Sequence, residues 1–88
     1  GENVHLPRVE AVIAEHPGVE EVSVRLNASG PDGRLKAFVV PAGGAEIDAA
    51  ALEEHCRERL RPVEQPRSFT FGQELPRNPL GKPADWPV

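Results

Sequence analysis

Cysteine, lysine and long apolar runs are all scarce in this chain of 88 residues. The single cysteine, Cys56, excludes a disulfide bond within the chain and fits a reducing compartment, so we expect a cytoplasmic protein. No apolar run is long enough to span a membrane, and the start of the chain does not resemble a secretory signal peptide. We therefore expect no membrane partner.

Lysine is scarce because eight of the ten basic residues are arginines, which leaves Lys36 and Lys82. The formal net charge of −4 argues against a general nucleic-acid binder. The charge is uneven, however: residues 1–54 carry four basic and ten acidic side chains, and residues 55–88 carry six and four. The basic end contains the segment "LPRNPLGK", residues 75–82, which suggests that this end meets an anion.

The first half of the chain predicts a helix followed by two strands. Residues 6–16 place apolar side chains at helical spacing, with Pro7 suited to the first turn and His16-Pro17-Gly18 placed to end the helix. Residues 19–28 alternate between apolar and polar, which predicts a half-buried strand. Residues 34–41 predict a second strand, and the turn residues 29–33 predict a hairpin that is closed by a loop.

The second half predicts one more helix and one more strand. Asp48 is a favourable N-cap for a helix that carries an apolar stripe of Leu52, Cys56 and Leu60 and ends at Pro62. Glu53 and Arg57 are spaced for an ion pair on its surface. Residues 67–71 predict a short third strand. The sequence thus predicts one α+β domain, with two main helices on a small, mostly antiparallel, three-stranded sheet in the order helix, strand, strand, helix, strand.

Few residues in this chain suggest chemistry by themselves. His5, His16, His55 and Cys56 show no metal-ligand spacing, so we interpret them as structural and expect no metal site. Four glutamates are interpreted as solvated faces: Glu20, Glu21, Glu53 and Glu54. The Gly81-Lys82 pair is not a phosphate-binding P-loop, because that motif needs a glycine where Pro76 stands and a serine or threonine where Pro83 stands. Residue by residue, Lys82 is either a solvated loop lysine or a functional one.

Three stretches in a fixed order indicate a family. They are "GENVHLPRVE" with "HPGVEEVSV" in residues 1–24, "GRLKAFVVP" in residues 33–41, and "LPRNPLGK" in residues 75–82. Together they make the whole chain, residues 1–88, resemble the small, mobile C-terminal domain of adenylate-forming, AMP-binding enzymes. That family includes acyl-CoA synthetases, the adenylation domains of peptide synthetases, and luciferases. The large N-terminal domain and the hinge of such enzymes are not in this sequence, so we interpret the chain as a fragment that is inactive alone.

The resemblance implies a catalytic role for Lys82. In this family a carboxylate attacks the α-phosphate of ATP, and the lysine of the closing motif stabilises the negative charge shared between the two groups. Pro76, Arg77, Asn78 and Gly81 match the loop that presents this lysine to the nucleotide. Prolines lower the entropy of such a loop, and Gly81 allows a turn that alanine does not favour. ATP with Mg²⁺ is then expected to bind mainly to the large domain.

The resemblance also implies a second active position of the domain. After rotation about the hinge, the opening loop, here Gly1, Glu2 and Asn3, lines the channel by which a thiol arrives. "GEN" resembles the acyl-CoA ligase branch more than the peptide-synthetase branch, so CoA is the expected thiol and a carrier protein the alternative. A non-catalytic docking module with the same fold is the third interpretation.

Two features near the C-terminus complete the sequence interpretation. Pro76 and Gly81-Lys82 reproduce the spacing at which acyltransferases modify this lysine in some acyl-CoA synthetases, so a lysine acyltransferase is an expected partner. The family usually continues past its Gly-Lys into a basic helical tail, whereas this chain continues with "PADWPV", whose prolines oppose a helix. Trp86 is interpreted as a packing residue.

Overall fold

The structure is a computed structural model that describes residues 4–26, 34–44 and 47–86. The expected order of helix, strand, strand, helix, strand is confirmed, and two short 3₁₀ turns, η1 and η2, are added to it. The elements in chain order are α1 (Leu6–Ala14), β1 (Val19–Leu26), β2 (Leu35–Pro41), η1 (Ala42–Gly44), α2 (Ala49–Arg59), η2 (Pro62–Glu64) and β3 (Pro66–Phe71).

The three strands form one mixed sheet with β2 in the centre. β1 and β2 are antiparallel, as the predicted hairpin requires, while β3 runs parallel to β2. The parallel pair arises because α2 carries the chain back to the starting end of β2 before β3 begins. The expectation of a mostly antiparallel sheet thus holds for the β1–β2 pair and not for β3. The turn predicted at residues 29–33 lies outside the described residues.

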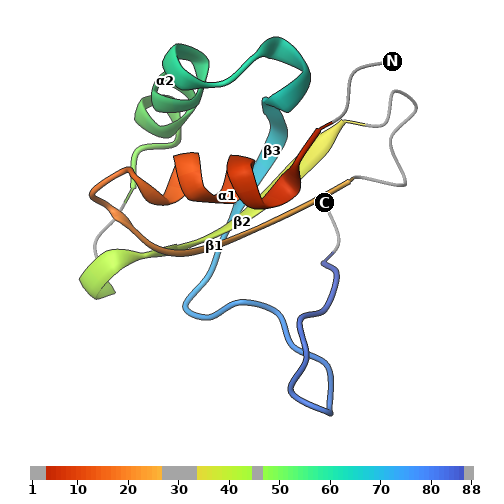
Figure 1. The fold of residues 1–88 in the computed structure, drawn as a ribbon. Helices are drawn as coiled ribbons and strands as arrows, with labels where there is room; N and C mark the ends of the chain where they lie inside the picture. Colours follow the sequence, from red (N-terminus) through yellow and green to blue (C-terminus); the bar gives the residue numbers. More distant parts are fainter. Residues whose placement is uncertain (1–3, 27–33, 45–46, 87–88) are drawn as a thin grey trace.

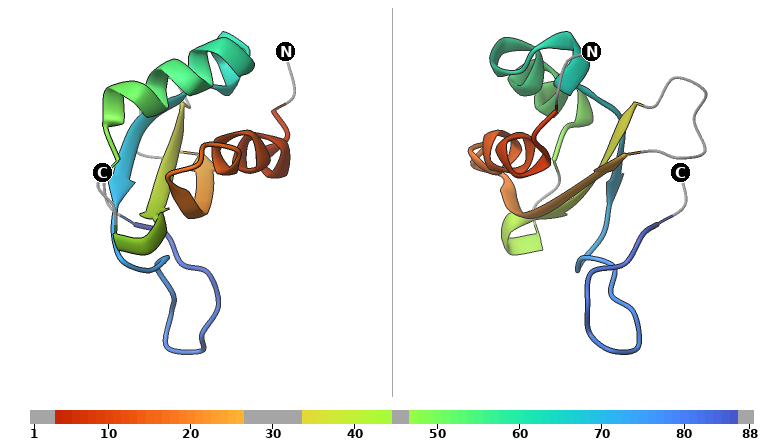
Figure 2. Two further views of the ribbon diagram at one scale, coloured as in Figure 1. Left: turned by 90° about the vertical axis from the view of Figure 1, so that its left-hand side faces the viewer. Right: turned by 45° about the vertical axis from the view of Figure 1, so that its right-hand side comes forward.

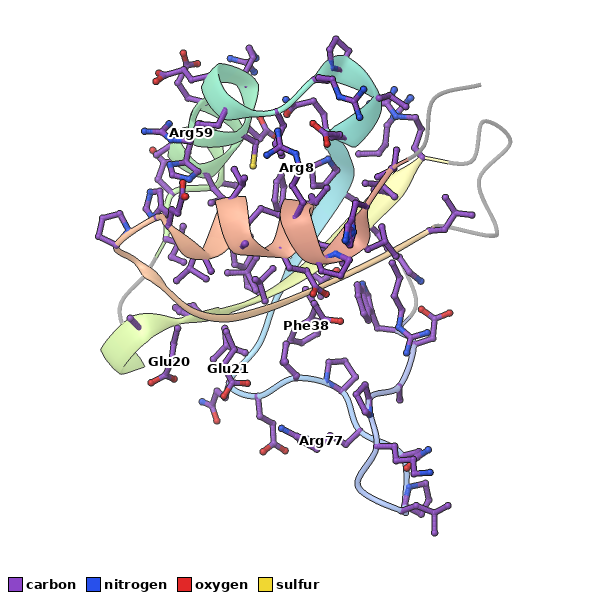
Figure 3. All side chains as sticks on the ribbon, in the orientation of Figure 1. Arg8, Glu20, Glu21, Phe38, Arg59 and Arg77 are labelled. Carbon is purple, nitrogen blue, oxygen red and sulfur yellow. The ribbon has the colours of Figure 1, made fainter. Side chains whose placement is uncertain are left out.

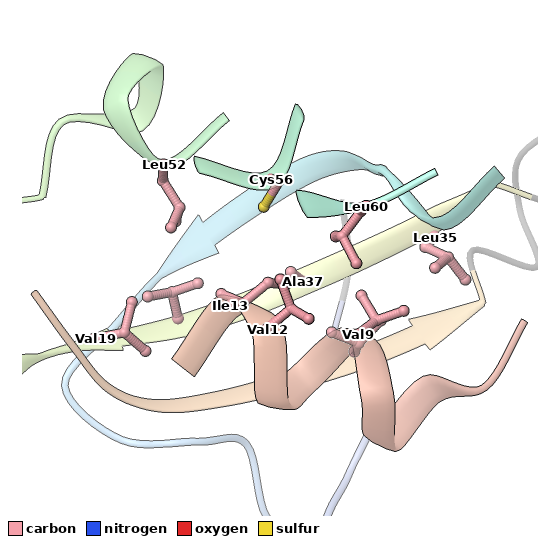
Figure 4. Packing of buried hydrophobic residues seen from close by; sticks show 11 residues of the cluster. Val9, Val12, Ile13, Val19, Leu35, Ala37, Leu52, Cys56 and Leu60 are labelled. Carbon is pink, nitrogen blue, oxygen red and sulfur yellow. The ribbon is translucent and has the colours of Figure 1, made fainter. Parts of the chain in front are cut away.

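Helices α1 and α2 cover one face of the sheet (Figures 1 and 2). Their apolar side chains meet those of the strands in a single core, shown in Figure 4. The predicted stripe of Leu52, Cys56 and Leu60 is confirmed, since all three side chains are buried there. Burial raises the pKa of the Cys56 thiol to about 11, so the thiol stays protonated and serves packing. Neither helix of the described part has the length and apolar character that a membrane crossing requires.

The ends of the helices follow local chemistry. Asp48 caps α2 as expected, because its carboxylate accepts a hydrogen bond from the Ala50 backbone N–H at 3.0 Å. α1 ends at Ala14, and His16 then shapes the following turn by accepting the Gly18 N–H at its Nδ1, also at 3.0 Å.

The prediction of an ion pair between Glu53 and Arg57 on α2 is wrong. Arg57 pairs with Glu54, three residues before it, with 2.6 Å between its Nη1 and the carboxylate. Residues three apart are neighbours on a helix just as residues four apart are, so spacing alone could not choose between the two glutamates.

The two ends of the C-terminal segment 72–86 lie against the opposite face of the sheet. Phe38 of β2 points toward this segment, away from the helices (Figure 3). The ring of Trp86 lies edge-on to that of Phe38, with centroids 5.6 Å apart, and Trp86 is 5% exposed, which confirms its packing role. Where the segment leaves β3, a Cβ on Gly72 would lie 2.5 Å from Phe38 Cζ, so any larger residue at this position would require the Phe38 ring to move.

Turn η2 is built around a buried carboxylate. Glu64 is 1% exposed, and its Oε1 accepts the Arg61 backbone N–H at 3.0 Å. Its Oε2 accepts Arg8 Nε at 3.2 Å, which joins η2 to α1. The Arg61 backbone hydrogen bond, followed by contacts with the Arg61 and Arg8 side chains, lowers the Glu64 pKa from 4.5 to about 2 despite the opposing effect of burial.

This geometry predicts a pH dependence of stability. Because folding lowers the pKa of Glu64, its ionised form stabilises the fold above pH 4.5, and this stabilisation is lost as the pH falls toward 2. Glu64→Gln should lower the free energy of unfolding at neutral pH by about 1–3 kcal/mol and flatten its dependence on pH in that range. Urea denaturation at a series of pH values measures both. Glu58→Gln, which removes an exposed carboxylate, is the control, and parallel pH curves for Glu64→Gln and the unmodified chain would contradict the assignment.

Candidate functional site

Beyond Gly72 the chain forms a hairpin that projects from the sheet, away from the helices (Figures 1 and 2). We call residues 75–84 the C-terminal hairpin. Arg77 and Pro83 form an antiparallel bridge, and the Ala84 N–H donates to the Pro76 carbonyl at 3.0 Å. The loop expected to present Lys82 therefore has a paired backbone.

The tip of the hairpin is a tight turn built by Asn78, Pro79 and Gly81. The Gly81 N–H donates to the Asn78 carbonyl at 2.8 Å, with Pro79 at the turn position where its fixed φ is favoured. The Asn78 side-chain oxygen accepts two further backbone N–H groups, those of Leu80 at 2.9 Å and Lys82 at 3.0 Å. Gly81 has φ of +81°, which confirms that this turn requires a glycine.

Lys82 emerges from this turn as an exposed cation. Its backbone carbonyl accepts the Asn78 N–H at 2.9 Å, so the residue is paired on both sides of its Cα. Its ammonium group makes no hydrogen bond or ion pair within residues 4–26, 34–44 and 47–86. The other basic side chain of the hairpin, Arg77, turns back toward the Gly81 carbonyl, 3.5 Å from its Nη1. The hairpin thus combines an ordered backbone with one lysine whose charge is available to an anion.

The structure brings one group of predicted site residues together. Pro76, Arg77, Asn78, Gly81 and Lys82 all lie in the C-terminal hairpin. The predicted thiol-channel residues Gly1, Glu2 and Asn3 lie outside the described residues. Among the described ranges, no group of three or more His, Cys, Asp or Glu side chains gathers as a metal site would require.

Two of the three histidines, His16 and His55, have structural surroundings. His16 and His55 lie edge-on with ring centroids 5.3 Å apart. His55 Nε2 lies 2.8 Å from the Val12 carbonyl near the end of α1, while His16 holds the turn described above. These contacts join the end of α1 to the middle of α2, in agreement with the structural interpretation of His16 and His55.

Lys36 has a structural role that the sequence did not reveal. From the sequence, it was expected only to lie in a strand. Lys36 is 4% exposed, and its Nζ lies 2.7 Å from an Asp85 carboxylate oxygen and 2.6 Å from the Trp86 carbonyl. This ion pair holds the pKa of Asp85 below its usual range, with the Trp86 backbone N–H as the second cause. The available signal was a lone lysine inside the apolar run 35–41, since a buried cation needs an acceptor.

Comparison with known proteins agrees with this fold and this loop. The family model described as the AMP-binding enzyme C-terminal domain matches residues 8–82, from α1 to Lys82. The chain belongs to this family. The relatives of this AMP-binding enzyme C-terminal domain include proteins named as a CoA ligase and as a carrier-protein ligase.

A 2-succinylbenzoate–CoA ligase of Geobacillus kaustophilus is 45% identical over 93% of this chain and 17% of that protein. An L-proline–[L-prolyl-carrier protein] ligase of Streptomyces coelicolor is 35% identical over 93% of this chain and 16% of that protein. Among solved structures, the amide bond synthetase McbA from Marinactinospora thermotolerans superposes with a TM-score of 0.80 at 37% identity, covering 93% of this chain and 17% of that one. The chain therefore spans about one sixth of the length of these relatives.

The tip geometry of this AMP-binding enzyme C-terminal domain gives a direct prediction. Asn78→Ala removes the acceptor of the Leu80 and Lys82 N–H groups, so both amides should exchange with solvent about tenfold faster, which is the loss of roughly one hydrogen bond's net stabilisation. Amide exchange followed by NMR measures this, with Asn78→Asp as the control that keeps an acceptor oxygen. Unchanged exchange at both amides in Asn78→Ala would show that the side chain does not shape the tip.

Proposed function

We propose that this chain is the mobile C-terminal domain of an ATP-dependent, AMP-forming acid–CoA ligase. The observation that carries the proposal is the exposed ammonium of Lys82, which has no partner among the described residues and sits on an ordered hairpin at the end of the family match. The activity belongs to the protein in which this domain is joined to a large N-terminal domain. The cytoplasmic location stays a prediction.

In the first half-reaction, the proposed role of Lys82 is electrostatic. A carboxylate oxygen attacks the α-phosphorus of ATP, a new P–O bond forms, and the bond to pyrophosphate breaks as it takes the electron pair. Two anions meet in this step, so a cation placed between carboxylate and phosphate oxygens stabilises the transition state more than the separated reactants. The paired backbone around Lys82 supports this role, because a held donor needs little reorganisation when charge develops.

Nucleotide binding is assigned mainly to the large domain. ATP enters with Mg²⁺ as substrate, and the residues of the C-terminal hairpin that would approach it are Pro76, Arg77, Asn78, Gly81 and Lys82. Of these, Asn78 and Gly81 set the backbone shape described above, and Lys82 carries the available charge. The isolated domain is accordingly proposed to be inactive.

In the second half-reaction, a thiol attacks the acyl carbon of the adenylate and AMP leaves. For this step the domain is proposed to rotate, so that the loop of Gly1, Glu2 and Asn3 lines the thiol channel. CoA is the acceptor that we favour, from the likeness of this loop to acyl-CoA ligases. A carrier protein is the alternative, supported by the prolyl-carrier protein ligase among the relatives. The docking-module alternative gives no reason for a free, ordered Lys82.

Lys82→Ala in the full-length protein tests the proposal. Losing one preorganised donor should slow adenylation by about 10²–10³-fold, while transfer of a pre-formed acyl-adenylate to CoA should be retained. The assay measures pyrophosphate release beside thioester formation from the adenylate.

Arg57→Ala is the matched control for that experiment, because it removes an exposed positive charge from α2, away from the hairpin. Equal losses in both half-reactions of Lys82→Ala, or normal adenylation, would remove the catalytic assignment. Efficient transfer to a carrier protein and none to CoA would select the alternative acceptor.

Acylation of Lys82 is proposed to switch adenylation off. Acylation removes the positive charge that the reaction uses, and Lys82 is exposed whereas Lys36 is 4% exposed and ion-paired. Treatment with an acyl donor and a protein acyltransferase should modify Lys82 in preference to Lys36 and stop pyrophosphate release, and a deacylase should restore it. Mass spectrometry maps the adducts. Full adenylation activity of protein modified at Lys82 would refute the switch.

A further inference from the structure

Lys36 is a buried cation whose acceptors all belong to one short segment. It extends from the central strand β2 onto the face of the sheet opposite the helices, where Asp85 and Trp86 lie. Its ammonium contacts the Asp85 carboxylate and the Trp86 carbonyl, and it lies 5.0 Å from the centroid of the Trp86 ring. The indole N–H itself has no hydrogen-bond partner among the described residues, so Lys36 and the ring of Phe38 hold this tryptophan.

The cost of burying the Lys36 ammonium fixes the position of the segment that binds it. An ammonium out of water is costly unless carboxylate and carbonyl oxygens replace its hydration. Sliding residues 85–86 along the sheet would leave Lys36 buried without acceptors, so the pair fixes where this segment lies. Arg25 of β1 adds a weaker contact, with its Nη2 3.5 Å from the Pro83 carbonyl.

The fixed segment is the direct continuation of the hairpin strand that carries Lys82. Only Pro83 and Ala84 separate Lys82 from Asp85, a span of about 10 Å at full extension. Pro83 restricts its own φ, and the Ala84 N–H is hydrogen-bonded to Pro76 on the other hairpin strand. Little conformational freedom therefore remains between the fixed Asp85 and Lys82.

We propose that Lys36 is a positioning residue for adenylation: by binding Asp85 and Trp86 it fixes the C-terminal strand of the hairpin, and thereby the place of Lys82. This inference rests on the proposed function of Lys82. Because Lys36 is buried against Asp85 and Trp86, its proposed role is exerted through Lys82. A mere contribution to stability is the competing explanation, and it predicts equal effects on both half-reactions.

The experiment uses the full-length protein and measures each half-reaction separately. Lys36→Met keeps the length of the side chain and removes the charge. Asp85→Asn removes the partner charge at an exposed position, and it remains informative if Lys36→Met fails to fold. Both should lower kcat for pyrophosphate release by about 10- to 100-fold, the cost of misplacing a group by around 1 Å, with KM for ATP and the thioester half-reaction unchanged.

Two controls separate positioning from stability. Asp85→Glu keeps the carboxylate and should restore adenylation. Val39→Ala opens the core on the opposite, helix-covered face of β2 and lowers stability without touching the hairpin, so both half-reactions should keep their rates in folded protein. Hydrogen exchange followed by mass spectrometry should show faster exchange in residues 76–86 of Lys36→Met and Asp85→Asn, but not of Asp85→Glu.

Normal adenylation in Lys36→Met or Asp85→Asn, beside an impaired Lys82→Ala, would overturn this inference and leave the proposed function standing. Equal losses in both half-reactions would also overturn it, in favour of stability alone. Full adenylation activity in Lys82→Ala would overturn the proposed function and this inference together.

Discussion

The central strand β2 has to be covered on both faces, and the arrangement of the molecule follows from that constraint. Leu35, Ala37 and Val39 face the helices and join their core, whereas Lys36 and Phe38 face the other way. The C-terminal segment supplies what this second face needs, an aromatic surface for the phenyl ring and oxygens for the ammonium. Because the segment begins at Gly72 and returns to the sheet at Trp86, the residues between them project from the sheet as a hairpin.

That hairpin meets two requirements of the catalytic role proposed for Lys82, and these two requirements usually conflict. The ammonium must be free to meet anions, yet its position must be reproducible. Here backbone pairing, the Asn78 side chain and the left-handed Gly81 supply order without using the ammonium of Lys82. The second lysine of the chain, Lys36, differs from Lys82 because its ammonium is bound within the fold, to the Asp85 carboxylate and the Trp86 carbonyl.

The sequence predicted what depends on local pattern and missed what depends on contacts distant in sequence. Helical spacing and alternation located the helices and strands, and the Asp48 cap and the turn at Gly81 followed from the conformations that these residues favour. The parallel direction of β3 and the Lys36–Asp85 pair join segments about thirty to fifty residues apart, and no local pattern encodes them. Lys82 could be selected as a candidate from its rarity and its motif, but the exposure of its ammonium, without a partner in the described part of the chain, is a property of the folded hairpin.

The most direct test of this account is a crystal structure of the full-length protein with a non-reactive acyl-adenylate analogue, in the adenylation conformation. We predict that Lys82 Nζ lies within hydrogen-bond distance, about 2.7–3.2 Å, of an acyl or phosphate oxygen of the analogue, with the hairpin unchanged and Lys36 still bound to Asp85 and Trp86. A complex in which another cation occupies that place while Lys82 remains in solvent would contradict it.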